Sequence, residues 1–219
     1  MKRNGVRPPR RGRRVPRTTD GRHDLGIAPN LPARDFKIGT PDTVWLADIG
    51  DVPADEGRPH LAAVKDPATM EMVGWSTSDR LKASLAVDAT GMALRNRRPT
   101  PGPIRHSDRG VRYACGDCRW PPKAHGALAS TSGKGDCLDD APMESVFGSS
   151  KTELVHRIGF ASRHDAEAAL FERIAIFHDR RRRHSSIGRR TPEQARIDTT
   201  RAQDRMVNTH QSGIGGRRQ

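Results

Sequence analysis

The sequence has few aromatic residues, few cysteines and no long apolar run. Aromatic residues make up 4% and hydrophobic residues 33% of the chain, so its core must be mainly aliphatic and modest in size. No apolar stretch reaches roughly 18 residues and no charged-then-apolar leader opens the chain, which argues against a membrane span or a secretory signal. Cys115, Cys118 and Cys137 form no disulfide framework and fit a reducing compartment.

Positive charge, by contrast, is abundant. The 219 residues include 39 Lys+Arg against 26 Asp+Glu, which gives a formal net charge of +13. Such an excess is the electrostatic footprint of a protein that binds a polyanion, most often a nucleic acid. The alternative is that an arginine-rich coding bias produces the basicity, because arginine supplies most of the positive residues.

Three segments of different composition follow one another. Residues 1–36 hold a basic arm rich in Pro, Gly and Arg and then a turn-rich connector, with too little apolar content to bury a core. This part is interpreted either as a DNA-contacting or interdomain linker or as a disordered tail. Residues 37–197 carry the apolar periodicity of a folded core. Residues 198–219 show no clear period, so an unstructured tail is predicted there.

Short apolar runs separated by Gly, Pro and Asp predict strands. Three consecutive strands are expected at residues 43–49, 60–64 and 70–76, and the short breaks between them favour antiparallel pairing. Further strands are expected within residues 103–108 and 127–131. Pro121 and Pro122 lie between these two runs and exclude an uninterrupted helix there.

Helical spacing and capping residues predict the helices. One helix follows the third strand, with Leu81, Leu85, Ala89 and Met92 in its apolar stripe, and another begins after Pro142. Ser162 and Asp165 resemble a capping box, which opens a helix whose expected inward residues are Ala166, Leu170, Ile174 and Phe177. Thr191, followed by proline at the first helical position, begins a last helix.

Three carboxylates stand out by position. Asp48 ends the first predicted strand, Asp108 follows the fourth, and Glu144 lies near the start of a predicted helix. In an open α/β sheet, ligand-binding sites form where strands end and helices begin. Carboxylates from separate elements are the ligands that hard cations such as Mg²⁺ prefer, and two such ions can promote phosphodiester chemistry. The pattern alone is only suggestive, because 26 acidic residues offer many such triples.

Five blocks of sequence carry a family resemblance. They are residues 18–36, 44–49, 106–110, 135–156 and 178–195, and 35 residues (109–143) separate Asp108 from Glu144. The chain resembles the catalytic, OrfB-type transposases of the insertion-sequence-three group, whose core is similar to retroviral integrases. The spacing matches the D,D(35)E pattern that gives this family its name.

The resemblance implies an α/β, ribonuclease-H-like fold with a five-stranded mixed sheet and helices on both faces. It implies that Asp48 bridges two Mg²⁺ or Mn²⁺ ions, that Asp108 holds one and that Glu144 holds the other. The expected activity is cleavage and strand transfer of DNA without a covalent protein intermediate. The expected partners are DNA, further copies of the chain and an upstream helix-turn-helix protein or domain. The expected location is the cytoplasm, on the nucleoid when bound to DNA.

Five residues are candidate DNA contacts by the same resemblance: Arg180, Arg181, Arg182, Arg183 and His184. Lys151 is a sixth candidate, because it follows Glu144 by two helical turns on the same face. The plainer interpretation is a solvated helix face for the arginine run and an exposed lysine at 151. Contacts of this kind would go to phosphates and would carry no sequence information. A zinc site that combines Cys115, Cys118 and Cys137 with His106 and His125 is a weaker alternative, because no second CxxC is present.

The sequence also departs from the family pattern. Asp51 stands where an aromatic residue is usual, and Lys65 stands where an apolar strand residue is expected. Pro121 and Pro122 replace helix-forming residues, and the chain begins close to the linker that normally follows the helix-turn-helix region. These features suggest a truncated or divergent copy. A second hypothesis is therefore an inactive transposase remnant that binds DNA without sequence preference.

Overall fold

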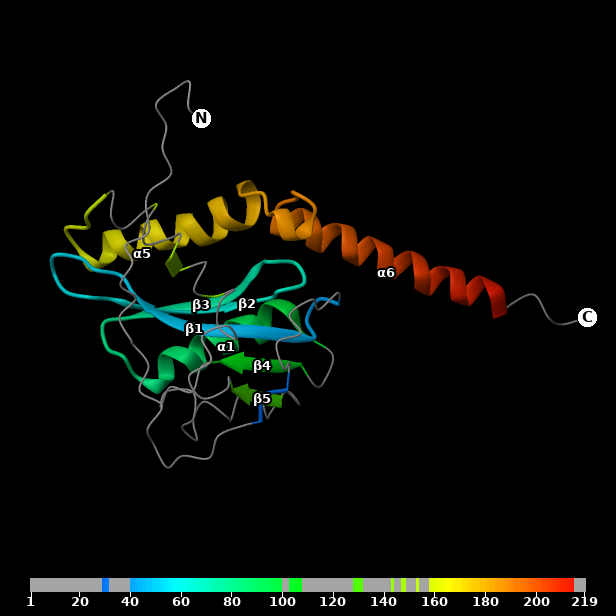
Figure 1. Cartoon of the computed structure of the whole chain (residues 1–219), viewed down its shortest axis with the longest axis horizontal. Helices are drawn as coiled ribbons and strands as arrows, with labels where there is room; N and C mark the ends of the chain where they lie inside the picture. Colours follow the sequence, from blue (N-terminus) through cyan, green and yellow to red (C-terminus); the bar gives the residue numbers. More distant parts are fainter. Residues whose placement is uncertain are drawn as a thin grey trace, which may run out of the picture.

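A five-stranded mixed sheet forms the centre of the molecule, in the order β3-β2-β1-β4-β5 (Figure 1). The structure is a computed structural model and describes residues 29–31, 40–99, 103–107, 128–131, 143, 147–148, 153 and 158–214, the last eight by their backbone only. Its elements are β1 (Val44–Asp51), β2 (His60–Lys65), β3 (Met72–Ser78), α1 (Ala83–Arg97), β4 (Ile104–Ser107), β5 (Leu128–Thr131), α5 (Arg163–Phe171), η3 (Glu172–Arg181), η4 (Ser185–Ile187) and α6 (Pro192–Ile214).

The first three strands form the expected antiparallel meander. Leu46 of β1 lies opposite Lys65 of β2, and His60 of β2 lies opposite Ser78 of β3. Strands β4 and β5 join this meander in parallel, with β4 beside β1 and β5 beside β4. The predicted strand positions and the antiparallel pairing of the first three strands are therefore confirmed.

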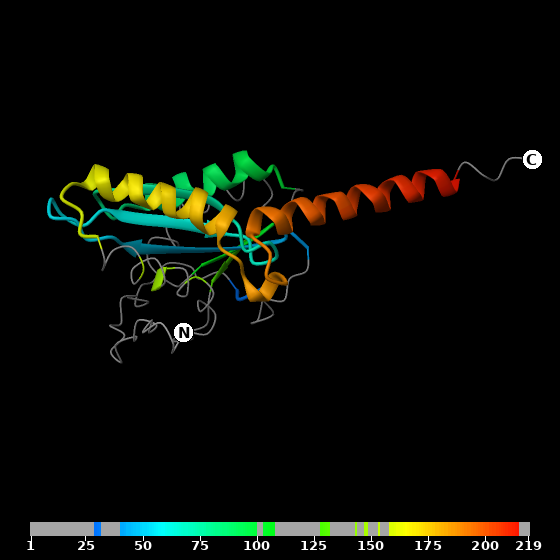
Figure 2. The ribbon, with the colours of Figure 1, turned by 90° about the horizontal axis from the view of Figure 1, so that it is seen from above.

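Alternate residues of β1 pack on opposite faces of the sheet, as the two-residue period of a strand requires. Val44 and Leu46 belong to the cluster that includes Leu170 and Ile174, whereas Trp45 lies in the cluster formed with α1. Helices therefore cover both faces, with α1 on one and α5 and η3 on the other, as the two views in Figures 1 and 2 show. This confirms the predicted fold class.

Helix α1 packs closely on the sheet because its inner stripe is small. Ala86, Ala89 and Ala93 are buried beside Leu85 and Leu94. This lets the helix backbone approach β3 at Gly74, where an added Cβ would collide with the backbone of α1. The helix ends at Arg98, whose φ of 45° is left-handed, after two arginines in the last turn that suit the helix dipole.

The predicted capping box opens α5. The Ser162 hydroxyl accepts a hydrogen bond from the backbone N–H of Asp165, and the Asp165 side chain accepts one from the backbone N–H of Ser162. The helix then continues as the π-helix η3, with hydrogen bonds five residues apart. This wider turn brings His178 and Asp179 to the buried face after Ile174. The prediction that Phe177 faces inward is therefore wrong: its side chain is 38% exposed.

Helix α6 begins as expected and runs further than expected. The Thr191 hydroxyl accepts a hydrogen bond from the backbone N–H of Gln194 at 3.2 Å, which caps the first turn. The sequence predicts an unstructured tail from residue 198, but α6 continues to Ile214 and extends away from the sheet (Figures 1 and 2). The segment contains no proline and no glycine before Gly213, so no residue in it stops a capped helix.

Several predicted features lie outside the described residues, namely most of 1–36, the Cys115–Cys118 motif, and Pro121 and Pro122. The domain limits at residues 36 and 197 remain predictions. Among the helices that the structure describes, none has the length and apolar character needed to cross a membrane.

Candidate catalytic and DNA-binding site

Asp48 lies near the middle of β1, on the sheet face that carries the α5 cluster, and it is half-buried. Its Oδ1 accepts a hydrogen bond from the backbone N–H of Ile49 at 2.7 Å. That contact stabilises the ionised carboxylate, because an N–H donor favours the charged form.

The parallel pair β1–β4 determines what lies beside Asp48. Ala47 of β1 is in register with Ser107, the last residue of β4. Asp48 and Asp108 are the next residues of the two segments in the sequence. Asp108 itself lies outside the described residues. The described part of β4 therefore ends at the level of Ala47, one residue before Asp48.

Met143 and Phe147 are described and buried, and both belong to the core cluster of Val44 and Leu46. The side chains of Met143 and Phe147 thus pack on the face of β1 that also carries Asp48. Glu144 and Lys151, the candidates from this part of the sequence, lie outside the described residues. Nowhere in the described ranges do three His, Cys, Asp or Glu side chains form a group that could hold a metal ion.

The arginine run does not form one uniform surface. Arg181 and Arg183 are exposed, and no described acidic residue pairs with either. Arg180 is exposed but lies 3.5 Å from Glu193, measured from its Nε to Oε1. Arg182 is only 30% exposed, and its Nη1 lies 3.3 Å from Oε2 of Glu153.

His184 closes a compact turn between η3 and α6. Its backbone N–H donates to the Arg190 carbonyl at 3.0 Å, and its carbonyl accepts from the Arg189 N–H at 2.8 Å. Gly188 and Arg189 have φ values of 71° and 59°, which reverse the chain there. Arg189 is exposed and, among the described residues, has no acidic partner, so it joins Arg181 and Arg183 as an available cation. Sequence reasoning missed it, although a second Arg-Arg pair follows Gly188.

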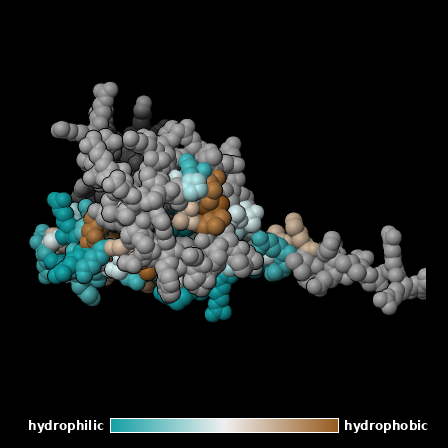
Figure 3. Space-filling model, turned by 90° about the horizontal axis from the view of Figure 1, so that it is seen from below, coloured by the Kyte–Doolittle hydropathy of each residue, from teal (hydrophilic) through white to brown (hydrophobic). Residues whose placement is uncertain are grey.

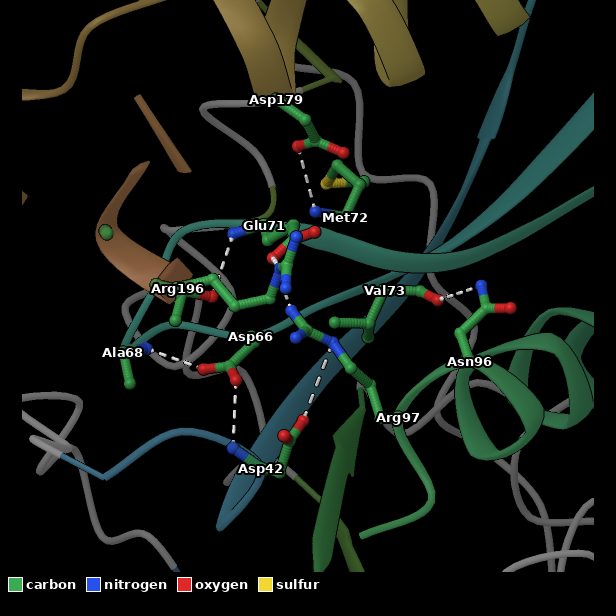
Figure 4. Close-up of polar contacts among 12 residues, drawn as sticks. Asp42, Asp66, Ala68, Glu71, Met72, Val73, Asn96, Arg97, Asp179 and Arg196 are labelled. Carbon is green, nitrogen blue, oxygen red and sulfur yellow. Dashed lines mark hydrogen bonds and ion pairs between the residues drawn. The ribbon is translucent and has the colours of Figure 1, made fainter. Parts of the chain in front are cut away.

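A buried charged cluster at the β2–β3 turn was also not predicted (Figure 4). Glu71 accepts a hydrogen bond from Nη2 of Arg97 at 2.5 Å and lies 3.1 Å from Nε of Arg196. One carboxylate thus joins the end of α1 and the start of α6 to the turn. Asp66 holds the turn itself, because its two oxygens accept from the N–H groups of Asp42 at 2.9 Å and Ala68 at 2.8 Å. Burial raises the pKa of both Glu71 and Asp66.

The same cluster continues to the end of η3. Lys65 is 1% exposed, and burial, with a smaller contribution from nearby Arg182, lowers its pKa to about 8. Nδ1 of His178 lies 2.9 Å from Oδ1 of Asp179, and the rings of His178 and His184 meet edge to face with their centroids 4.9 Å apart. Burial lowers the pKa of His178 to about 3 and that of His184 to about 4, so both are neutral at pH 7.

Two of the departures from the family pattern, Asp51 and Lys65, lie in the described residues and have different outcomes. Asp51 is half-exposed and pairs with His60 directly across the β1–β2 ladder, 2.7 Å from its Nδ1. It therefore avoids the cost of an unpaired buried acid. Lys65 is buried, and it lies within electrostatic reach of Asp179, which raises its pKa and partly offsets the effect of burial.

The face seen in Figure 3 carries a mixed surface. Hydrophilic residues gather at one end of its coloured part, and a small apolar patch lies near the middle. Exposed large apolar residues in the described ranges include Leu128 at 54% and Phe171 at 55%. Isolated exposed apolar residues are normal, so neither indicates a ligand by itself.

Comparison with solved structures defines the class of this fold. The simian T-cell lymphotropic virus intasome, in complex with the PP2A regulatory subunit B56 gamma, matches 82% of this chain and 61% of its own chain, with a TM-score of 0.60 and 14% identity. The catalytic domain of Mos1 mariner transposase matches 62% of this chain and 71% of its own, with a TM-score of 0.51 and 14% identity. The sheet and helices are thus those of a ribonuclease-H-like integrase or transposase core.

Sequence comparison then identifies the family. Two signatures of the Integrase core domain match residues 40–137 and 144–199. The Insertion element IS600 uncharacterized 31 kDa protein of Shigella sonnei is 41% identical over 175 residues, which cover 80% of this chain and 64% of that protein. Transposase InsF for insertion sequence IS3A of Escherichia coli K12 is 40% identical over 172 residues, 78% of this chain and 60% of that protein.

The chain belongs to the Integrase core domain family, and over most of its length it is similar in sequence to proteins of the IS3 and IS600 insertion elements. The recognised resemblance is therefore confirmed. The chain spans less than two thirds of the length of these two relatives.

Proposed function

We propose that this chain is the catalytic part of a DNA transposase, which cleaves DNA at element ends and joins them to a target. The observation that carries the proposal is the parallel register of Ala47 with Ser107. Continued by one residue, that register would bring the Asp108 carboxylate beside Asp48. The burial of Met143 and Phe147 on the same face of β1 supports Glu144 as the third member of the site.

The donor set fits a hard divalent cation. Asp48, Asp108 and Glu144 offer only carboxylate oxygens, which suit Mg²⁺ or Mn²⁺ and not a soft metal. The HTLV-2 integrase catalytic core, which is 14% identical with a TM-score of 0.51, was solved in complex with magnesium. Two bound ions would activate the attacking oxygen and stabilise the leaving oxygen of a phosphodiester. The chain itself would supply Asp48, whose carboxylate accepts a hydrogen bond from the Ile49 N–H, as one of the metal ligands.

The partners follow from the same proposal. Lys151 and the segment from Arg180 to His184 would contact DNA phosphates, with Arg181 and Arg183 the best placed because they are exposed and unpaired among the described residues. Assembly on DNA would involve several copies of the chain; the HTLV-2 integrase catalytic core was solved in a dimeric form. A helix-turn-helix protein or domain would recognise the element ends. The protein would act in the cytoplasm, on the nucleoid when bound to DNA.

The test is metal-dependent DNA cleavage by the full chain, measured on a labelled duplex that carries an element end, with Mn²⁺ or Mg²⁺. Asp48→Asn, Asp108→Asn and Glu144→Gln should each abolish cleavage and leave DNA affinity unchanged. The matched control is Asp55→Asn, an exposed acid in the β1–β2 connection, which should retain full activity. Cleavage that survives a substitution in the triad would contradict the assigned site. DNA binding without Mn²⁺ binding would instead support an inactive remnant.

A further inference from the structure

Gly50 lies two residues after Asp48 on β1 and is buried. Because side chains alternate along a strand, positions 48 and 50 share one face of the sheet, the face of Val44 and Leu46. A Cβ atom at Gly50 would lie 2.5 Å from Cδ1, 2.7 Å from Cε1 and 3.2 Å from Cγ of Phe147. The Phe147 ring therefore occupies the space that any side chain at position 50 would need.

The lack of room for a side chain, and not the backbone conformation, explains the glycine at position 50. Gly57, Gly159 and Gly188 have positive φ values, whereas Gly50 lies in extended strand geometry, in the ladder opposite Leu61. An alanine or a threonine would adopt this backbone without strain. What excludes them is the aromatic ring.

The ring is anchored on several sides. Phe147 is 8% exposed and lies in one cluster with Met143, Val52 and Phe160. Met143 and Phe147 stand on either side of position 144 in the sequence. The contact between Phe147 and Gly50 thus determines how closely Phe147 approaches the strand that carries Asp48.

We propose that Gly50 is a positioning residue, whose missing side chain provides the seat for Phe147 and so sets the distance between the Glu144 segment and Asp48. The inference rests on the proposed function, because it assigns the contact between Gly50 and Phe147 a role in holding the metal ligands together. A methyl group at position 50 would push the ring away and with it the segment. Outer contacts that orient metal ligands typically change metal affinity by about 10–100-fold when lost.

Gly74 provides a matched control. It is also a strand glycine with no room for a Cβ, but its neighbours are the backbone and Ala93 of α1 on the opposite face. Gly74→Ala therefore also creates a clash, here with the backbone of α1 and away from the proposed site. A general loss of packing would affect both variants, whereas a positioning role would affect only Gly50→Ala.

The experiment measures Mn²⁺ binding by calorimetry for the full chain, together with its melting temperature. Gly50→Ala should weaken Mn²⁺ affinity by about tenfold or more, and Gly74→Ala should leave it within about twofold, since its clash lies on the other face. Phe147→Leu placed in the Gly50→Ala background should restore the affinity, because the smaller side chain leaves room for the methyl group. If Gly50→Ala does not fold, the double variant should fold and bind Mn²⁺.

Two outcomes would overturn the inference: Mn²⁺ affinity in Gly50→Ala equal to that of the unsubstituted chain, or a loss that Phe147→Leu does not relieve. A double variant that remains unfolded counts as the second outcome. Failure of the proposed function looks different, because the unsubstituted chain itself would then bind no Mn²⁺. In that case the melting temperatures still test the contact between Gly50 and Phe147. Gly50→Ala should lower the melting temperature, and adding Phe147→Leu should restore part of the loss.

Discussion

The carboxylate of Asp179 accepts a hydrogen bond from the backbone N–H of Met72 over 3.1 Å. The contact ties the end of η3 to β3, which is an edge strand of the sheet. From the other helix layer, the Asn96 side chain donates to the Val73 carbonyl at 3.1 Å. Side chains of two helices thus form hydrogen bonds with backbone groups of this edge strand that would otherwise be unpaired.

The Asp179 contact predicts a pH dependence of stability. Burial raises the pKa of Asp179 to about 7, whereas an unfolded aspartate titrates near 3.9. Between these values the native state binds a proton that the unfolded state has lost, so the stability contribution falls as the pH rises through this window. Asp179→Asn should therefore raise the free energy of unfolding at pH 8, by up to about 4 kcal/mol, with the difference vanishing towards pH 4.

The Asp179→Asn measurement is urea denaturation at several pH values between 4 and 8.5. The asparagine Oδ1 retains the acceptor for Met72, so the loss of charge is tested without loss of the hydrogen bond. Asp204→Asn on the exposed part of α6 should follow the pH profile of the unsubstituted chain. Parallel profiles for Asp179→Asn and the unsubstituted chain would show that Asp179 is ionised in the fold across this range.

Glu71→Gln should destabilise the chain by about 1.5–3 kcal/mol, the usual contribution of a hydrogen bond to a charged group. The glutamine leaves Arg97 and Arg196 without the carboxylate that joins them, and the Glu71 side chain is only 18% exposed. Equilibrium unfolding in urea measures the effect. Asp198→Asn, which breaks an exposed pair with Arg190, should leave stability within error because such pairs contribute little. Equal effects of the two substitutions would argue against the Glu71 junction.

The exposed arginines should determine DNA affinity. A triple variant with Arg181→Gln, Arg183→Gln and Arg189→Gln should weaken DNA binding and reduce the slope of log affinity against log salt by about three, roughly one per lost phosphate contact. Arg182→Gln should instead lower stability, because Arg182 pairs with Glu153. Fluorescence anisotropy at several salt concentrations measures the slope. An unchanged slope in the triple variant would remove this surface from the DNA interface.

Ser162→Ala should cost about 1 kcal/mol of stability, because it removes the N-cap acceptor of α5. Ser162→Asp should retain most of that stability, since aspartate is also a good N-cap residue. Thermal or urea unfolding of the two variants tests the capping box directly. Equal stability of Ser162→Ala and the unsubstituted chain would mean that α5 is held by packing of Ala166 and Leu170 alone.

The part of this fold that could be predicted follows from local patterns in the sequence. The alternating apolar runs at β1, β2 and β3 and the cap residues Ser162 and Thr191 act within a few residues of themselves. The family blocks around Asp48, Asp108 and Glu144 predicted the fold class, which is confirmed. The roles of these three residues remain predictions.

Contacts between distant segments leave no local pattern in the sequence. The π-helical turn moves Phe177 outward and brings His178 and Asp179 into the core. Lys65 lies close to Asp179 and Arg182 at the end of η3, more than a hundred residues away, and Arg182 pairs with Glu153, whereas Arg181 and Arg183 are exposed.

The sequence by itself therefore determined the strands, the caps and the family. The tertiary structure decided which charges are buried, which arginines face solvent and why position 50 must be glycine. The physical reason is that burial and electrostatics depend on neighbours in space, and no local period of the sequence records which neighbours those will be.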